Sequence, residues 1–197
     1  MAVVAGNEVA ERIRRQTVHL PRRIENTVYY RSIAEGKGTQ EIYLALLEKM
    51  WAFLNGFESR VRDRREWDGL GFDFSERSKL DRLEADLRHF GRHPVRSNGI
   101  ELPLDGASFG FICGYLYVIE SLTMIGQNQF RILSRKIGIQ SNQGGAFLSS
   151  YGDRAGWMFR QLQEFMDRVA SLHHGAAADM VDGATDAYHR LEAWLKA

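Results

Sequence analysis

The chain has 197 residues, enough for one compact domain with its own hydrophobic core, so we expect a single domain over residues 1–197. It is 44% hydrophobic and 26% charged, a composition that excludes an intrinsically disordered protein. Its 26 Lys and Arg residues nearly balance 25 Asp and Glu residues, which argues against a nucleic-acid partner.

The cysteine content and the apolar runs indicate the cellular compartment of the protein. The one cysteine, Cys113, excludes an internal disulfide and a cysteine-rich metal cluster. Residues 1–11 lack the apolar core of a signal peptide. The longest apolar run, residues 109–119, is too short to cross a bilayer, which takes ~20 residues. We therefore expect a soluble, cytoplasmic chain without a membrane contact.

Apolar residues recur at three- and four-residue steps along most of the chain, as in amphipathic helices. In residues 40–61 this stripe follows Thr39, a suitable N-cap. Residues 107–137 form the most apolar stretch, and we expect a bend in this long helix around Ser121 and Gly126. Further helices are predicted over residues 77–90, 157–172 and 176–195, and a loop over residues 91–105. The sequence predicts an all-α, compact bundle of six to eight helices.

The histidines and the cysteine form no recognisable metal or catalytic motif. His89 and His93 are four residues apart, but a helix-breaking glycine lies between them. His173 and His174 precede a glycine, as at a helix C-terminus. The chain lacks the two Glu-x-x-His motifs of a di-iron bundle. Cys113 lies inside the apolar run, so we interpret it as a buried structural thiol.

Three segments, taken in order, point to one known family. Residues 13–25 read IRRQTVHLPRRIE, residues 114–126 read GYLYVIESLTMIG, and residues 147–160 and 189–195 follow near the C-terminus. These segments resemble the first helix, the distal helix and the C-terminal half of bacterial heme oxygenases, including those paired with bacteriophytochromes. The resemblance covers nearly the whole chain. It implies an all-helical fold in which heme lies between a first-helix ligand and a long, kinked distal helix.

On the first helix this sequence differs from the family at the position of the iron ligand. Thr17 and Glu25 match the family's pattern, and the position between them, where the family has its heme-ligating histidine, is Pro21. Proline has no side-chain donor atom for iron and removes a backbone N–H. His19 is the alternative axial ligand, but on a helix it shares its face with arginines and is expected to point to water.

The sequence of the distal helix also differs from the family's pattern. The family's glycines let the backbone lie against the porphyrin, because a residue without Cβ permits that approach. Here Ser121 and Ile125 stand at two of these positions, and Gly126 is retained. The branched Ile125 side chain would overfill the place of the ring, at a cost of ~1–3 kcal/mol or more.

Two arginines match positions that resemble the family's heme-propionate contacts. These are Arg14 and Arg160, and a guanidinium pairs well with a carboxylate. They would suit an anionic ligand, although either can equally be a residue of a solvated helix face. Tyr151, in the third segment, is interpreted as a packing residue.

Three hypotheses follow from these residues. The first is a degenerate heme oxygenase-like protein that has lost heme cleavage and binds another tetrapyrrole or a small anionic ligand. The second is an active heme oxygenase, which would cleave heme to biliverdin, CO and iron with a non-standard ligand such as His19. The third is a helical protein-interaction module, for example a homodimer.

Overall fold

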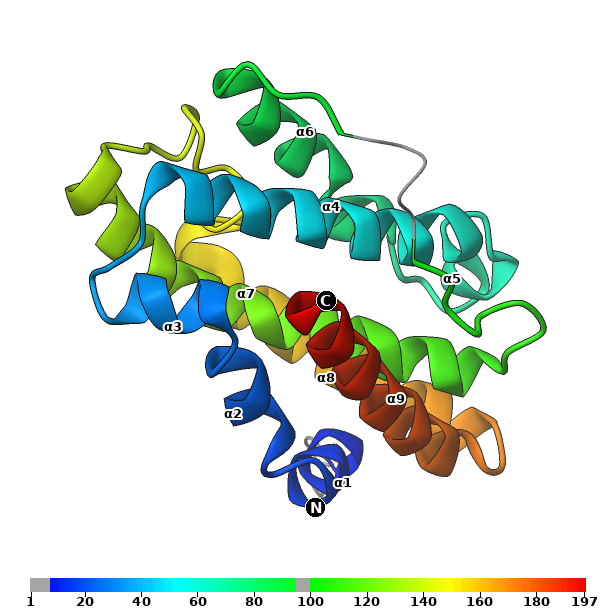
Figure 1. Cartoon of the computed structure of the whole chain (residues 1–197). Helices are drawn as coiled ribbons and strands as arrows, with labels where there is room; N and C mark the ends of the chain where they lie inside the picture. The colour runs from blue at the N-terminus through cyan, green and yellow to red at the C-terminus, as the bar shows by residue number, and fades with distance from the viewer. Residues whose placement is uncertain (1–7, 95–99) are drawn as a thin grey trace.

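The computed structural model describes residues 8–94 and 100–197, and these residues form helices without a strand (Figure 1). The all-α prediction is confirmed. The described helices are α1 Glu8–Gln16, α2 Leu20–Glu25, α3 Val28–Ala34, α4 Gln40–Val61, α5 Arg65–Gly69, α6 Leu80–His89, α7 Phe109–Ile137, α8 Ala155–Leu172 and α9 Ala176–Lys196, with the 3-10 helices η1 Ser75–Arg77 and η3 Gly152–Arg154. The prediction of six to eight helices was too low, because the chain before α4 divides into three short helices.

The helix α4 follows the predicted bounds. The Thr39 hydroxyl accepts a hydrogen bond from the Ile42 N–H at 3.3 Å, as expected for an N-cap. Its apolar stripe, which includes Leu46, Phe53 and Phe57, is buried. The amphipathic pattern therefore carried enough information to place this helix and its start.

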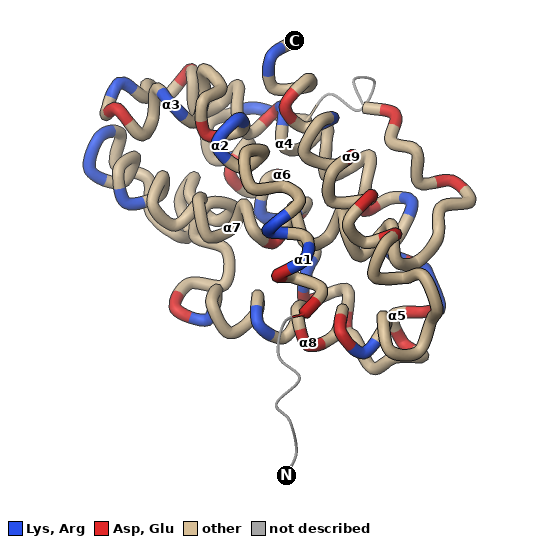
Figure 2. The backbone as a smooth tube through the Cα atoms, turned by 90° about the horizontal axis from the view of Figure 1, so that it is seen from below, with Lys and Arg blue, Asp and Glu red and all other residues tan. Residues whose placement is uncertain are grey.

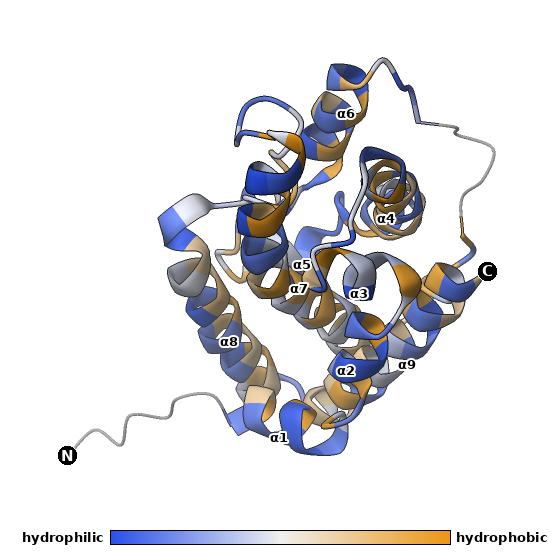
Figure 3. Cartoon of the chain, turned by 60° about the vertical axis from the view of Figure 1, so that its left-hand side comes forward, coloured by the Kyte–Doolittle hydropathy of each residue, from blue (hydrophilic) through white to orange (hydrophobic). Residues whose placement is uncertain are grey.

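The helix α7 is the longest of the described helices, and its buried residues extend from Gly110 to Leu133. Ser108 caps it by accepting a hydrogen bond from the Phe111 N–H, and it ends at Gly138, whose φ of +77° suits glycine. Its axis turns along its length in Figure 1, as predicted. Cys113 is fully buried on it, as expected. Hydrophobic residues gather on the inward sides of α4 and α7 (Figure 3).

The expectation from the apolar run of residues 109–119 needs a correction. By length and composition, α7 is long and apolar enough to span a membrane. However, 72% of its most apolar window is buried inside the fold, as in the core helix of a folded domain. The run looked short because polar residues interrupt it, whereas the helix continues through them to Ile137.

Glycines allow α7 and α9 to approach very closely. A Cβ on Gly183 of α9 would lie 2.0 Å from the Phe111 carbonyl oxygen of α7. A Cβ on Gly114 of α7 would lie 2.2 Å from the Met180 carbonyl oxygen of α9, and Gly110 makes a similar approach. No side chain fits at these distances, so the glycines set the spacing of the two helices.

The short helices α1 and α2 are held by the C-terminal helices. The Val9 N–H donates to an Asp167 carboxylate oxygen of α8 at 3.0 Å. Arg23 of α2 forms a 2.7 Å ion pair with Glu192 of α9. In Figure 1, α1 and α2 lie at the lower edge of the molecule beside α8 and α9. The N-terminal segment is therefore part of the packed domain.

The segment predicted as a loop, residues 91–105, is described only in part. Its described residues, 91–94 and 100–105, carry no helix or strand, and Asn98 and Gly99, two of the residues behind the prediction, lie outside the described residues. In the view of Figure 2, acidic and basic residues are interspersed along the described helices and do not gather into one basic stripe.

Candidate functional site

The first helix of the resemblance is two helices in this structure. The helix α1 ends at Gln16, and the Thr17 N–H and hydroxyl both donate to the Ile13 carbonyl, each at 2.9 Å. The Leu20 N–H then donates to the Thr17 carbonyl at 2.9 Å, which closes a turn. Pro21 is in the first turn of α2, where its missing N–H costs nothing. The residue where the resemblance expects the iron ligand is therefore in the first turn of a new helix.

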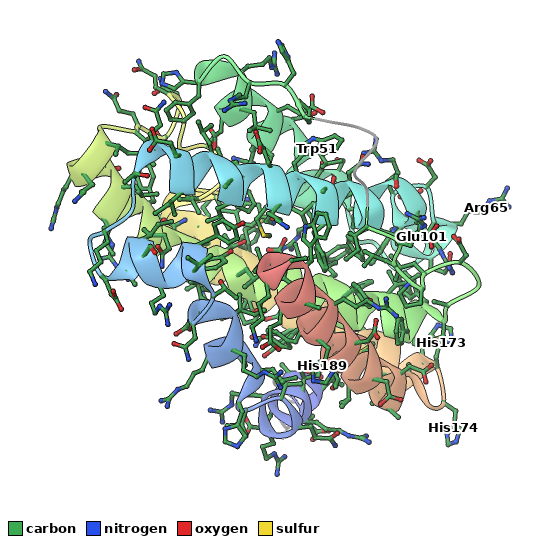
Figure 4. All side chains as sticks on the ribbon, in the orientation of Figure 1. Trp51, Arg65, Glu101, His173, His174 and His189 are labelled. Atoms are coloured by element: carbon green, nitrogen blue, oxygen red, sulfur yellow. The ribbon has the colours of Figure 1, made fainter. Side chains whose placement is uncertain are left out.

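His19 lies in the turn between α1 and α2. It is exposed, as its helical position predicted, and its side chain makes no capping hydrogen bond. The other five histidines are exposed as well. In Figure 4, His173 and His174 lie at the α8–α9 loop, far from α2, and His189 lies on α9. Every histidine of the chain is thus a surface residue in this structure.

A hydroxyl pair lies on the face of α7 that carries Ser121. The Ser121 hydroxyl donates to the Val118 carbonyl at 2.7 Å, and its oxygen lies 3.2 Å from the Tyr188 hydroxyl of α9. Burial raises the pKa of Tyr188, the hydrogen bond to Ser121 lowers it, and the nearby Glu25 carboxylate raises it. The structure therefore brings Ser121 of α7 to Tyr188 of α9, within range of the Glu25 charge on α2.

Tyr117, one turn before Ser121, joins the same site. It is buried, and its ring contacts Phe159 of α8 at a centroid distance of 5.4 Å. Burial, with the neighbouring Tyr188, raises the pKa of Tyr117 to about 12, while the charge of Arg14 on α1 lowers it. Sequence reasoning missed Tyr117 and Tyr188 as site residues, although both belong to apolar helical stripes that reach this face.

Apolar side chains are exposed on the elements around this site. Ile125 is half-buried against the core, and its neighbour Met124 is 47% exposed. Other large exposed apolar residues are Val18 in the α1–α2 turn, Val28 of α3 and Trp157 of α8. Exposed apolar residues are common singly, and of these residues Met124, three positions after Ser121 on α7, is the nearest to Ser121 along the chain.

Gly126 lies on a different side of α7 from Ser121 and Ile125. On a helix of 3.6 residues per turn, Ile125 is about 40° from Ser121, whereas Gly126 is about 140° away. A Cβ on Gly126 would lie 3.1 Å from the Leu148 carbonyl oxygen. In this structure the close approach of Gly126 is thus to the chain's own backbone, and its place in a ligand pocket stays a prediction.

The two candidate propionate contacts differ in their surroundings. Arg14 is 72% exposed, and its Nε and Nη2 donate to the Glu11 carboxylate at 3.0 and 2.7 Å. Arg160 of α8 is exposed and has no ion pair within the described part of the chain. Of the two, Arg160 is therefore the better placed to meet an anion.

The structure contains a buried charge network around Glu120 of α7 that the sequence did not predict. Glu120, 1% exposed, accepts a 2.6 Å hydrogen bond from the ammonium group of Lys79, which is 2% exposed. Tyr151 donates to the same carboxylate at 2.8 Å, and the buried Arg77 lies 3.7 Å from it. Burial and the Glu120 charge raise the pKa of Tyr151. The sequence signal that could have indicated this network is Glu120 itself, a glutamate inside an apolar helical run.

Tyr151 is therefore more than a packing residue. It also accepts a 2.9 Å hydrogen bond from Lys79, and its backbone has a φ of +67°, which non-glycine residues rarely adopt. Burial lowers the pKa of Lys79, and the charge of Glu120 raises it. The network fixes the helix turn that leads directly into Ser121.

Three solved heme oxygenases share this arrangement of helices. The enzyme from Neisseria meningitidis, studied in NO- and CO-bound forms, superposes with a TM-score of 0.79 and 19% identity over 95% of this chain and 90% of that one. The chain has the heme oxygenase fold. The enzyme from Leptospira interrogans gives a TM-score of 0.73 at 15% identity, over 95% of this chain and 98% of that one.

The third structure is heme oxygenase-1 from the cyanobacterium Synechocystis sp. PCC6803 in complex with heme. It gives a TM-score of 0.72 at 17% identity over 95% of this chain and 90% of that one. No protein-family model and no curated protein sequence matches the chain. The heme oxygenase fold is thus present at low sequence identity.

Proposed function

We propose that this chain is a heme oxygenase-like protein that does not cleave heme. It uses the site between α1–α2 and α7 to bind a tetrapyrrole without an iron ligand from the protein, or another small anionic ligand. The observation that carries the proposal is Pro21, which lies in the first turn of α2 at the position where the resemblance expects the iron-binding histidine.

The residues at the site do not fit an iron-bound heme. Proline offers no donor atom, and an axial ligand is what tunes heme iron for oxygen chemistry. Ile125 places a branched side chain where the resemblance expects a glycine, and filling a tight site with extra atoms costs ~1–3 kcal/mol. These two changes act independently and in the same direction. We therefore derive no reaction step through heme for this chain.

What the site offers is polar recognition and apolar contact. The Ser121 and Tyr188 hydroxyl oxygens can accept a hydrogen bond from a ring N–H of a ligand, and Arg160 can pair with a carboxylate. Met124 and Trp157 supply exposed apolar surface for a flat ring system. This combination suits an amphipathic, anionic ligand.

We also propose that the protein is cytoplasmic.

The double substitution Pro21→His with Ile125→Gly is expected to create hemin binding. It supplies an imidazole at the ligand position and removes the crowding side chain. Because the crowding alone is worth ~1–3 kcal/mol, hemin should bind about tenfold or more tightly than to the native chain. An absorption titration with hemin measures this, and an intense, saturable Soret band is the expected signature.

The control is Pro21→Ala with Ile125→Gly, which makes the same backbone and space changes without an imidazole. It should lack the Soret band of the histidine variant. A native chain that binds hemin as tightly as the histidine variant, and loses that binding on His19→Ala, would contradict the proposal in favour of His19 as the ligand. A parallel titration with biliverdin tests the metal-free tetrapyrrole, and circular dichroism checks that each variant folds.

A further inference from the structure

A pocket opens on the side of the molecule where α6 meets the start of α8. It has a volume of about 220 Å³ and is lined by Glu76, Arg82, Tyr151, Arg154 and Met158. These residues come from η1, α6, η3 and α8 and the segment before η3, so the fold gathers distant parts of the sequence here. The candidate tetrapyrrole site does not share a residue with this lining.

The two arginines of the pocket have no carboxylate partner among the described residues. Arg82 lies over the Tyr151 ring at 5.7 Å, and Arg154 lies over the Trp157 ring at 5.0 Å, with its Nη2 3.8 Å from the Met158 sulfur. Other arginines of the chain, such as Arg23 and Arg190, pair with carboxylates at 2.7 Å. Two guanidinium groups that face one cavity are a suitable binding site for an anion.

The charges around the pocket favour an anion with a single charge. Beneath Tyr151 the buried network is balanced, since Arg77 and Lys79 lie beside the carboxylates of Glu120 and Glu58. At the rim, Arg82 and Arg154 face one carboxylate, Glu76. Two positive charges and one negative charge give the rim a net charge of +1, which a monoanion neutralises. A dianion would exceed this charge and would be repelled more strongly by Glu76.

The walls and the size narrow the ligand further. The Tyr151 ring and the Met158 side chain offer apolar surface beside the two guanidinium groups. At about 220 Å³ the pocket has room for a small molecule. The Tyr151 ring is held in place by its hydrogen bonds to Glu120 and Lys79, so this wall is preformed.

We propose that this pocket binds a small monocarboxylate with a flat apolar body. Its carboxylate bridges Arg82 and Arg154, and its apolar body lies against Tyr151 and Met158. A ligand there ties α6 to α8 beside the network that holds Glu120. This inference stands on the pocket alone and does not depend on the tetrapyrrole proposal.

The experiment uses benzoate as the probe, with calorimetry for affinity and amide chemical shifts for location. Saturable binding is expected, with shifts at Tyr151, Arg154 and Met158. Arg82→Gln and Arg154→Gln should each weaken benzoate by about tenfold or more, as for loss of a hydrogen bond to a charged group. Arg82→Lys keeps the charge and should lose less than Arg82→Gln.

Three comparisons make the test specific. Arg88→Gln, on the same helix but outside the pocket lining, should leave benzoate affinity unchanged. Benzamide, a neutral molecule of the same shape, should bind much more weakly, and inorganic phosphate should bind less tightly than benzoate. Absence of saturable benzoate binding, equal binding of benzamide, tighter binding of phosphate, or an equal loss in Arg88→Gln would each overturn the proposal.

Discussion

Gly183→Ala is expected to destabilise the protein by more than about 3 kcal/mol. The new Cβ would lie 2.0 Å from the Phe111 carbonyl oxygen and 2.8 and 2.9 Å from the carbonyl carbon and Cα of the same residue. All three atoms belong to the backbone of α7, so no side chain can rotate to make room. The helices α7 and α9 must move apart, and their shared core with them. Urea unfolding followed by circular dichroism measures the loss.

Gly156→Ala is the matched control for this substitution. Gly156 lies in the first turn of another long helix, α8, but a Cβ there would lie 3.7 Å from its nearest neighbour, a guanidinium nitrogen of Arg160. Alanine is a better helix former than glycine, so this variant should be unchanged or stabilised by up to ~1 kcal/mol. Equal stabilities of the two variants would contradict the close packing of α7 on α9.

Glu120→Gln is expected to cost about 3–5 kcal/mol, the range for removing one partner of a buried ion pair. It leaves the ammonium group of Lys79, 2% exposed, with the Tyr151 hydroxyl but without the carboxylate 2.6 Å away. Burial already lowers the pKa of Lys79, so the unpaired charge is poorly tolerated there. Urea unfolding at neutral pH gives the change in free energy.

The control is Glu11→Gln, which breaks the ion pair with Arg14 on the surface of α1. That pair is 72% and 41% exposed at its two ends, and exposed pairs are worth about 0–1 kcal/mol. In a double-mutant cycle, Lys79→Met with Glu120→Gln should lose less than the sum of the two single losses, because each single change strands the other group. Additive losses, or a Glu120→Gln loss as small as that of Glu11→Gln, would contradict the network.

Local patterns predicted the helices well. The periodicity of α4, the cap at Thr39 and the end of α7 at Gly138 all depend on residues within a few positions of one another, and the structure has them as predicted. Burial of Cys113 followed from its apolar neighbours. These features are local, so a single stretch of sequence contains the forces that produce them.

The site was harder to predict because its contacts join distant residues. Lys79 and Glu120 are separated by 41 residues, and Ser121 and Tyr188 by 67. The local sequence around a buried glutamate does not predict that it will form an ion pair with a lysine of another element. The resemblance predicts Pro21, Ser121 and Gly126 as site residues, but it could not predict that Gly126 also packs against Leu148.

The most direct test of the central claim is a turnover assay of the native chain with hemin, a reductant and oxygen, with the Neisseria meningitidis heme oxygenase as positive control. A chain that has the heme oxygenase fold but Pro21 in place of an iron ligand should release neither biliverdin nor CO. Conversion of bound hemin to biliverdin with release of CO would contradict the account.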